Sequence, residues 1–246
     1  MDQRAIQKIA IADLDWQGIA SDLDIEGYAL LPKLLDSAQA KALTTLVLDT
    51  GARNRQRSFL NPEPERGNIL RLSRPLPDPL SAWHEALYKQ LAPIANHWAE
   101  LLGKDSYYPS TLDGFLRGNH EASQIESLAT ASCLQEGDYQ ALHQHAEGKH
   151  VFPLQLVVLL SDPGTDFTGG EFVMTEQRPR MQSRPMVLPL RQGDAALITV
   201  AHRPHKGSNG YYRVNLKHAI SRVHSGERIG VELLFHDDTQ EQIHVG

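Results

Sequence analysis

From Leu134 onward the sequence is a succession of short apolar segments separated by glycine, proline and aspartate. These segments are VFPLQLVVLL, GGEFVMTE, MVLPL, GDAALITV and GVELLFHD, which begin at residues 151, 169, 186, 193 and 230. Closely spaced strands with turn residues between them are typical of a barrel or a sandwich. We therefore expect an antiparallel β core in this half of the chain.

The first part of the chain predicts a strand followed by a helix. The strand covers residues 28–31, and Asp36 is placed to cap the helix that follows. Leu43, Leu46 and Val47 form an apolar stripe with helical spacing, and Gly51 follows as the expected stop.

A second helical segment runs from Asp78 to Leu102, and Pro93 should kink or divide it. Residues 51–77 and 104–130 show no sustained period and are expected to be loops. The chain should thus place helices before a β core, most economically in one domain.

Composition and cysteine content exclude several classes of protein. The charged fraction of 22% is ordinary for a globular chain, and no apolar run is long enough to span a membrane. The first residues lack the apolar core of a secretory signal, so we expect a cytoplasmic protein with no membrane partner. Because Cys133 is the only cysteine, any metal site must be built from His, Asp and Glu.

Charge is distributed unevenly along the chain. The net charge is −6, yet residues 178–228 contain eight arginines and two lysines against Asp194 and Glu227. This segment carries +8 and leaves −14 for the rest. It is suited to an anionic partner, although a solvated basic face has the same composition.

Two histidines separated by one residue, His143 and His145, are candidate metal ligands. On a strand they would point to the same face and could bind one ion, but twelve histidines in the chain make the pair weak evidence alone. Downstream, His218 precedes Arg228 by ten residues, and Ser225-Gly226 is expected to be the turn between their strands. This pattern would place a third imidazole and a guanidinium inside a barrel, where a guanidinium binds carboxylates by two parallel hydrogen bonds.

These motifs resemble those of the double-stranded β-helix oxygenases that use Fe(II) and 2-oxoglutarate. That family has a His-x-Asp or His-x-Glu pair, a strand pair containing Gly-Gly, a distal histidine and, about ten residues later, an arginine. The matching segments here are HQH at 143–145, TGGEF at 168–172, GDA at 193–195, and His218 with Arg228. HVFPLQ, TEQRPRMQSR, LRQGDA and YRVNL are similar to a bacterial subgroup described as nucleic-acid-type 2-oxoglutarate oxygenases.

The resemblance implies an α+β fold in a single domain spanning 1–246. A double-stranded β-helix, which is a cupin-like jelly roll, would cover 131–240, with helices and loops over 1–130 as its support. The implied activity is that of a dioxygenase of the hydroxylase or demethylase type. Fe(II) and 2-oxoglutarate would be its cofactor and cosubstrate, and a nucleic acid or another anion its substrate.

The implied metal ligands are His143, His145 and His218, and this set departs from the family because position 145 lacks a carboxylate. Three neutral imidazoles leave a divalent ion with its full charge and also suit zinc, copper or nickel. Glu147 is an alternative carboxylate, and a second alternative is that residue 145 binds no metal. His202 and His205, in a segment that resembles a mobile loop, and His224 are rival third ligands.

The resemblance also assigns Arg228 to the distal carboxylate of 2-oxoglutarate. Tyr139 and Gln155 are expected beside the cosubstrate, with plain packing roles as the alternative. The candidate substrate-binding residues are Arg178, Arg180, Arg184 and Arg213. The competing hypothesis is a relative with altered or no catalysis that binds a metal as a sensor or partner module, and loss of the carboxylate at 145 favours it.

Overall fold

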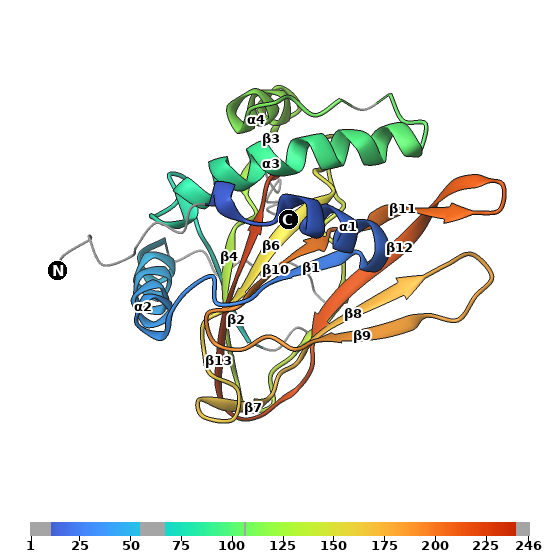
Figure 1. The fold of residues 1–246 in the computed structure, drawn as a ribbon. Helices are drawn as coiled ribbons and strands as arrows, with labels where there is room; N and C mark the ends of the chain where they lie inside the picture. Colours follow the sequence, from blue (N-terminus) through green and yellow to red (C-terminus); the bar gives the residue numbers. More distant parts are fainter. Residues whose placement is uncertain (1–10, 55–66, 106, 240–246) are drawn as a thin grey trace, which may run out of the picture.

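The chain forms two antiparallel sheets, with helices packed against the larger one (Figure 1). The computed structural model describes residues 11–54, 67–105 and 107–239. The larger sheet has the order β1-β10-β6-β13-β4-β2, and β7 pairs with the first part of β13. Its strands are β1 (Tyr28–Leu31), β10 (Ala195–Thr199), β6 (Leu154–Leu159), β13 (Val223–Leu234), β4 (Thr130–Gln135), β2 (Asn68–Arg71) and β7 (Phe167–Gly169).

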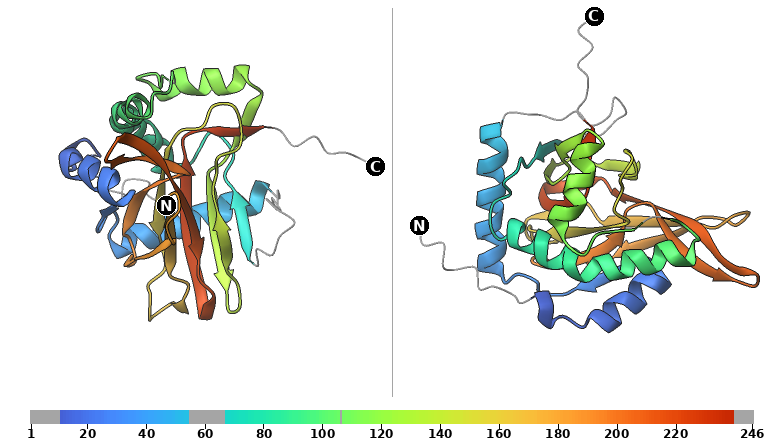
Figure 2. Two further views of the ribbon diagram at one scale, coloured as in Figure 1. Left: turned by 90° about the vertical axis from the view of Figure 1, so that its right-hand side faces the viewer. Right: turned by 90° about the horizontal axis from the view of Figure 1, so that it is seen from above.

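The smaller sheet has the order β11-β12-β8-β9, and β5 pairs with the end of β12. Its strands are β11 (His202–Gly207), β12 (Gly210–Ile220), β8 (Phe172–Gln177), β9 (Arg184–Leu188) and β5 (Gln140–His143). The hairpins β8–β9 and β11–β12 extend beyond the helices, as Figure 2 shows from above. A short pair, β3 (Gln124–Ser127) with β14 (Asp237–Thr239), lies apart from both sheets.

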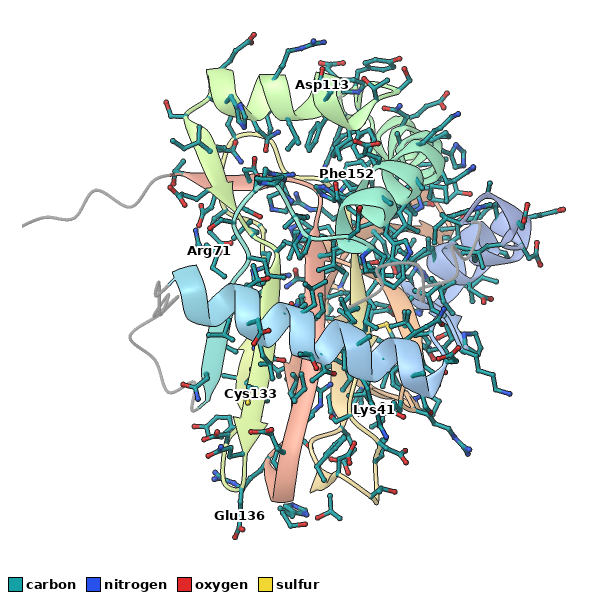
Figure 3. The ribbon with its side chains drawn as sticks, turned by 90° about the vertical axis from the view of Figure 1, so that its left-hand side faces the viewer. Lys41, Arg71, Asp113, Cys133, Glu136 and Phe152 are labelled. Carbon is teal, nitrogen blue, oxygen red and sulfur yellow. The ribbon has the colours of Figure 1, made fainter. Side chains whose placement is uncertain are left out.

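Helices α1 (Trp16–Glu26), α2 (Ser37–Asn54), α3 (Leu80–Leu101) and α4 (Leu112–Glu121) follow a 3-10 turn over Ile11–Asp13. In Figure 3, α2 lies across β2, β4 and β13. The predicted cap is present as a reciprocal pair, because the Gln39 N–H donates to Asp36 Oδ1 and the Asp36 N–H donates to Gln39 Oε1.

The alternation of side chains along β13 separates two cores. Ile229, Val231, Leu233 and Phe235 pack in the cluster shared with the helices. Val157, Ile198, Phe172 and Leu216 belong to a second cluster between the two sheets. Because successive strand residues point to opposite faces, Arg228, Gly230 and Glu232 must face the space between the sheets. No helix in the described part of the chain is long and apolar enough to cross a membrane.

Two helix predictions need correction. Gly51 does not stop α2, which continues to Asn54, because a glycine costs a helix about 1 kcal/mol without forcing it to end. Pro93 does not divide α3, since residues buried on both sides of it hold the helix together. These residues include Leu87, Leu91, Ala95 and Trp98.

The predicted loops are also partly wrong. The segment 51–77 contains β2, and 104–130 contains α4, β3 and the first residue of β4, while residues 55–66 lie outside the described part. These elements are short, and β2 is held by its pairing with β4, so a local sequence pattern is weak. The N-terminal part therefore contributes two strands, β1 and β2, to the larger sheet as well as its supporting helices.

A predicted turn and a predicted loop are also wrong, because pairing with other strands overrides the local pattern. Ser225 and Gly226 lie within β13, where they pair with β7, and the chain turns earlier at Ser221 and Arg222. His218 and Arg228 therefore lie on strands of different sheets, and not on paired neighbours. The segment expected to be a mobile loop around His202 and His205 is the hairpin β11–β12.

Candidate metal and cosubstrate site

Four side chains meet between the two sheets and form a candidate metal centre. They are His143 at the end of β5, His145 two residues later, His218 on β12 and Glu232 on β13, and their potential ligand atoms lie within 4.8 Å of one another. The ring centroids of His143 and His218 are 4.2 Å apart, and those of His143 and His145 are 4.8 Å apart. Glu232 Oε2 lies 3.4 Å from His145 Nε2 and 3.6 Å from His218 Nε2.

The local structure explains this convergence. His143 and His218 are direct partners in the β5–β12 pairing, so their side chains leave the sheet together. His145 lies beyond the end of β5, and its carbonyl accepts a hydrogen bond of 3.0 Å from Nε2 of the buried His236. Glu232 reaches the same point from the larger sheet. The cluster is thus assembled from both sheets.

The electrostatics of the cluster favour metal binding. Burial acts to raise the pKa of Glu232, but hydrogen bonds and charge from His145 and His218 outweigh it and hold the pKa well below its usual range. Burial lowers the pKa of His218 to about 4, so this imidazole is neutral near pH 7. An ionised carboxylate beside a neutral imidazole is the protonation state that a metal requires.

Hydrogen bonds orient two of the rings. His143 Nδ1 lies 2.8 Å from the Ala141 carbonyl, which can only accept, so Nδ1 carries the proton and Nε2 is left with its lone pair. His218 Nε2 lies 3.2 Å from Nε2 of the fully buried Gln155, and His218 Nδ1 and Gln155 Oε1 are buried atoms without a hydrogen-bond partner among the described residues. Buried polar atoms without partners are rare, so these two indicate that a further group belongs here.

Arg228 lies on the same face of β13 as Glu232. Its Nε donates to the Gly170 carbonyl at 2.8 Å, and the positive φ of Gly170 (64°) brings that carbonyl within reach. A side chain at position 230 would meet Arg228 Nη1 at 3.1 Å, so Gly230 leaves room for the guanidinium along the strand. The glycines at 170 and 230 therefore serve to place this arginine.

Arg228 is a buried cation without an ionic partner among the described residues. It is 3% exposed, and burial lowers its pKa to about 10, which leaves it charged at neutral pH. A small cavity of about 10 Å³ is lined by Arg228, Glu232, Gly230 and Ser132 together with apolar side chains of both sheets. This space suits a single water and would have to widen for a dicarboxylate. A buried, unpaired guanidinium is unfavourable unless an anion binds it.

The structure brings His143, His145 and His218 together as predicted. Glu232 was missed, although it is the charged residue in the otherwise apolar segment that follows Arg228 in β13, four positions after that arginine and hence on the same face. Glu147, the alternative carboxylate, is exposed and lies outside the cluster. The three rival histidines also lie outside it, with His202 and His205 half-buried and His224 exposed.

The remaining predicted residues fall in different places. Gln155 lies against His218. Tyr139 instead packs under Arg222, whose Cζ lies 5.0 Å from the centre of the tyrosine ring, and Tyr139 does not line the small cavity beside Arg228. Arg178 pairs with Glu176 at 2.8 Å and Arg184 pairs with Glu26 at 2.6 Å, so these charges are locally offset. Arg180 and Arg213 are exposed and make no ion pair with a described residue.

Cys133 is not an activated thiol. Burial raises its pKa to about 12, with a further contribution from Glu227, whose Oε1 lies 3.1 Å from Sγ. A thiol that stays protonated is a poor nucleophile. Cys133 therefore packs as a small, half-buried side chain.

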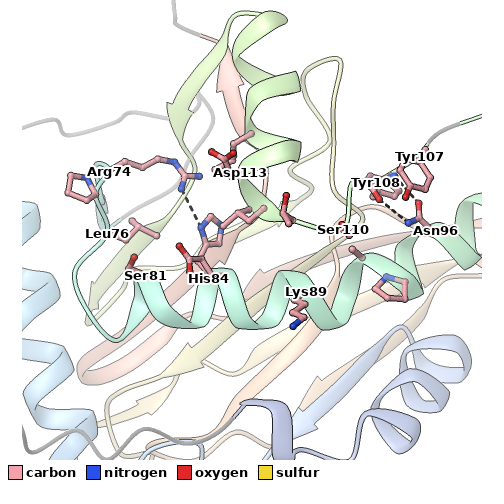
Figure 4. A pocket seen from close by; sticks show the side chains of 17 residues that line it. Arg74, Leu76, Ser81, His84, Lys89, Asn96, Tyr107, Tyr108, Ser110 and Asp113 are labelled. Atoms are coloured by element: carbon pink, nitrogen blue, oxygen red, sulfur yellow. Dashed lines mark hydrogen bonds between the residues drawn. The ribbon is translucent and has the colours of Figure 1, made fainter.

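A large cavity lies away from the histidine cluster. It has a volume of about 960 Å³ and is formed by α3, the start of α4 and the segment around Arg74 (Figure 4). His84, at its base, accepts from Arg74 at 3.3 Å and donates to the Leu234 carbonyl at 2.9 Å. No residue of the metal cluster lines this cavity.

The residues of the cluster fit Fe(II) and 2-oxoglutarate. Two histidines and one carboxylate with open positions are the ligand set of non-haem iron oxygenases, and this cluster contains that set plus one more imidazole. The carboxylate of Glu232 offsets one charge of a divalent ion, which three imidazoles alone would not do. The unpaired guanidinium of Arg228 supplies the cation that the free carboxylate of 2-oxoglutarate needs.

Comparison with known proteins agrees with this geometry. The profile of the Oxygenase-NA family, described as "Oxygenase, catalysing oxidative methylation of damaged DNA", matches residues 67–238. Two uncharacterized proteins of Mycobacterium tuberculosis, MT2286 and Rv2227, are each 43% identical over 163 residues, covering 66% of this chain and 70% of theirs.

Solved structures show the same fold. A prolyl-4-hydroxylase from Pseudomonas putida aligns with 92% of this chain and 99% of its own, at 12% identity and a TM-score of 0.55. SnoK, a non-haem α-ketoglutarate-dependent carbocyclase from nogalamycin biosynthesis, aligns with 94% of this chain and 87% of its own, at 10% identity and a TM-score of 0.51. The predicted α+β fold with a jelly-roll core is confirmed. The chain belongs to the Oxygenase-NA family, and it is an oxygenase of the type that depends on Fe(II) and 2-oxoglutarate.

Proposed function

We propose that this oxygenase binds its metal through His143, His145, His218 and Glu232, and that it oxidises a nucleic acid. The observation that carries the proposal is the carboxylate of Glu232 among the three imidazoles. With Glu232 included, the chain offers the charge and the donor types of an iron oxygenase despite the histidine at position 145. The departure from the family motif is therefore compensated from another strand.

Fe(II) with 2-oxoglutarate and dioxygen supplies the insertion of one oxygen atom into a substrate bond, while the other enters succinate as carbon dioxide is released. Arg228 would fix the distal carboxylate of 2-oxoglutarate by paired hydrogen bonds from its guanidinium. Gln155, held against His218, would donate to or accept from a polar group bound beside that ring. The apolar walls of the roll would exclude bulk water from the reacting atoms.

A nucleic acid substrate is supported by two observations. The family description refers to damaged DNA, and residues 178–228 carry a net charge of +8. His218 and Glu232 are 1% and 6% exposed, so a base can approach the metal only when it is unpaired or turned out of a duplex. The single cysteine and the need for reduced iron support the cytoplasm as the compartment.

Turnover of 2-oxoglutarate tests the proposal. Purified protein loaded with Fe(II) under argon and then exposed to air should convert 2-oxoglutarate to succinate, and an alkylated single-stranded oligonucleotide should accelerate the conversion. The unmethylated oligonucleotide is the control for the substrate. Absence of succinate with Fe(II), although the metal binds stoichiometrically, would refute the oxygenase assignment for this chain.

A second candidate function is a metal-binding sensor or partner module. The specific observation in its favour is the fourth donor, because four protein ligands leave fewer positions open on the metal than three do. Metal analysis of the isolated protein and anaerobic titration with 2-oxoglutarate separate the two functions. Tightly held zinc and no affinity for 2-oxoglutarate would favour the sensor.

A further inference from the structure

The outward face of the smaller sheet carries an unusual concentration of cations. Along β12 the residues with odd numbers point away from the roll, since Val214, Leu216 and His218 are buried within it. Arg213 and Lys217 therefore face outward, and both are exposed. Lys206 lies beside them because it pairs with Tyr211 in the β11–β12 hairpin.

Within the described strands β8, β9, β11 and β12, the outward face carries no carboxylate. The pairing of β8, β9, β11 and β12 defines its members, and none of those within the strands is Asp or Glu. The outward positions are Val173, Thr175, Gln177, Pro185, Val187, His202, Pro204, Lys206, Tyr211, Arg213, Asn215, Lys217 and Ala219. No described acidic residue forms an ion pair with Lys206, Arg213 or Lys217. Their charges are thus left to an external partner.

A further lysine approaches the same face from α3. Lys104, just after the end of that helix, is exposed, and Figure 1 shows this end of α3 above the β11–β12 hairpin. The pKa of Lys104 is lowered, mainly by burial and secondly by the positive charge of Arg213. The pKa of His202 is also lowered, first by burial and then by the charges of Arg213 and Lys104. His202 Nδ1 is also buried without a hydrogen-bond partner among the described residues. Like charges are therefore held together here at a cost in free energy.

The surface differs from the arginines of the TEQRPRMQSR motif. Arg178 pairs with Glu176 within the same hairpin, and Arg184 pairs with Glu26 at the end of α1, so both charges are locally offset. Arg180 of the motif is exposed and makes no ion pair with a described residue, but the larger group of such cations lies on β11, β12 and the end of α3. The distribution of unpaired positive charge therefore points to the outward face of β12 as the region that meets an anion.

The spacing of the cations favours a polymer over a single anion. Arg213 and Lys217 are four strand residues apart, or about 13 Å, which exceeds the reach of one phosphate group and suits a chain of phosphates. Tyr211, 44% exposed, lies in the same row and offers an aromatic face for a base. Lys217 immediately precedes His218 on β12, so the row ends level with the metal cluster, on the opposite face of the smaller sheet.

We propose that Lys104, Lys206, Arg213 and Lys217 form a binding track for the sugar–phosphate backbone of a single nucleic acid strand, with Tyr211 stacking on a base. The inference rests on the proposed nucleic acid substrate and assigns it a surface. The track holds the strand outside the roll while one unpaired base enters between the sheets. No base-specific contact is required of it.

Binding of a fluorescein-labelled single-stranded oligodeoxynucleotide tests the track. Affinity is measured by fluorescence anisotropy over a series of salt concentrations for the wild-type chain and for the variant Lys206→Gln/Arg213→Gln/Lys217→Gln. Each lost phosphate contact should reduce the slope of log K against log salt by about 0.7, so the triple variant should lose about two in slope. The variant Lys41→Gln, on the exposed side of α2 away from the track (Figure 3), is the control and should match the wild type.

Three outcomes would overturn the track. These are an unchanged slope and affinity in the triple variant, an equal loss in Lys41→Gln, and displacement of the oligonucleotide by inorganic phosphate at the same phosphate concentration. A thermal unfolding midpoint equal to that of the wild type shows that the triple variant is folded, and Tyr211→Ala gives a second reading through lost stacking. Failure of the proposed function gives a different result: the wild-type protein forms no succinate, whether or not it binds the oligonucleotide.

Discussion

The replacement Glu232→Gln gives the sharpest test of the metal site. The amide keeps the size of the side chain and removes the charge that lies 3.4 Å from His145 Nε2 and 3.6 Å from His218 Nε2. Loss of a residue that only supports a metal ligand weakens binding by about 10- to 100-fold. A directly bound, charged ligand should exceed this, so we expect more than about a 100-fold loss of affinity, or about 2.7 kcal/mol.

A carboxylate restored at position 145 should reverse the loss. His145 Nε2 and Glu232 Oε2 are near neighbours, so side chains at the two positions reach the same point. The double variant Glu232→Gln/His145→Asp should therefore recover most of the affinity, whereas His145→Asn in the same background should not. Anaerobic calorimetry with Fe(II), or with Mn(II) as an air-stable substitute, measures each of the four proteins.

Two results would refute this reasoning. If Glu232→Gln binds Fe(II) as tightly as the wild type, the carboxylate is not a ligand. If Glu232→Gln loses the metal and neither Asp nor Asn at position 145 changes that, the two positions do not serve one centre. Circular dichroism of the metal-free variants establishes that each is folded before the titrations are compared.

Two further predictions concern binding and pH. Arg228→Gln should weaken the binding of 2-oxoglutarate by about 30-fold or more, because a charge-assisted hydrogen bond is worth about 2 kcal/mol or more. The affinity for Fe(II) should stay nearly unchanged in the same calorimetric assay. If the variant binds 2-oxoglutarate as tightly as the wild type, Arg228 is not its anchor. Burial lowers the pKa of His84 and of His236 to about 3, below the 6.5 of the unfolded chain. The contribution of these two groups to stability should therefore be complete above pH 6.5 and fall as acid is added, by about 4 kcal/mol between them at pH 5 in urea unfolding, and His84→Gln should remove about half of that contribution.

The sequence was sufficient for the larger features because they repeat along the chain. The apolar segments from Leu154 to Leu234 form strands of the roll, and the Asp36 cap and the stripe of Leu43 and Val47 form a helix. The His143 pair, His218 and Arg228 are recognisable because their spacing reflects the strand order of a known family. Elements that depend on distant partners, such as β2, were not visible in local patterns.

Glu232 could not be assigned from the sequence alone for a physical reason. Its strand parity matches that of Arg228, but parity gives only the face and not the depth at which a side chain meets one from another sheet. The error over Ser225 and Gly226 had the same origin, since a Ser-Gly pair suits a turn locally and yet lies in a strand paired with β7. Contacts between sheets decide both questions, and they are set by tertiary packing.

The position of Glu232 also changes what a bound metal does to the fold. His143 and His218 both belong to the smaller sheet, so a site that takes its carboxylate from position 145 binds on one sheet and its adjoining loop. Glu232 belongs to β13, at the centre of the larger sheet. A metal held by Glu232 therefore joins the two sheets directly, close to the cavity that Arg228 lines. In this chain, closure of the roll and formation of the metal site become parts of one equilibrium, and any ion that binds all four donors stabilises the packed sheets by its own binding free energy.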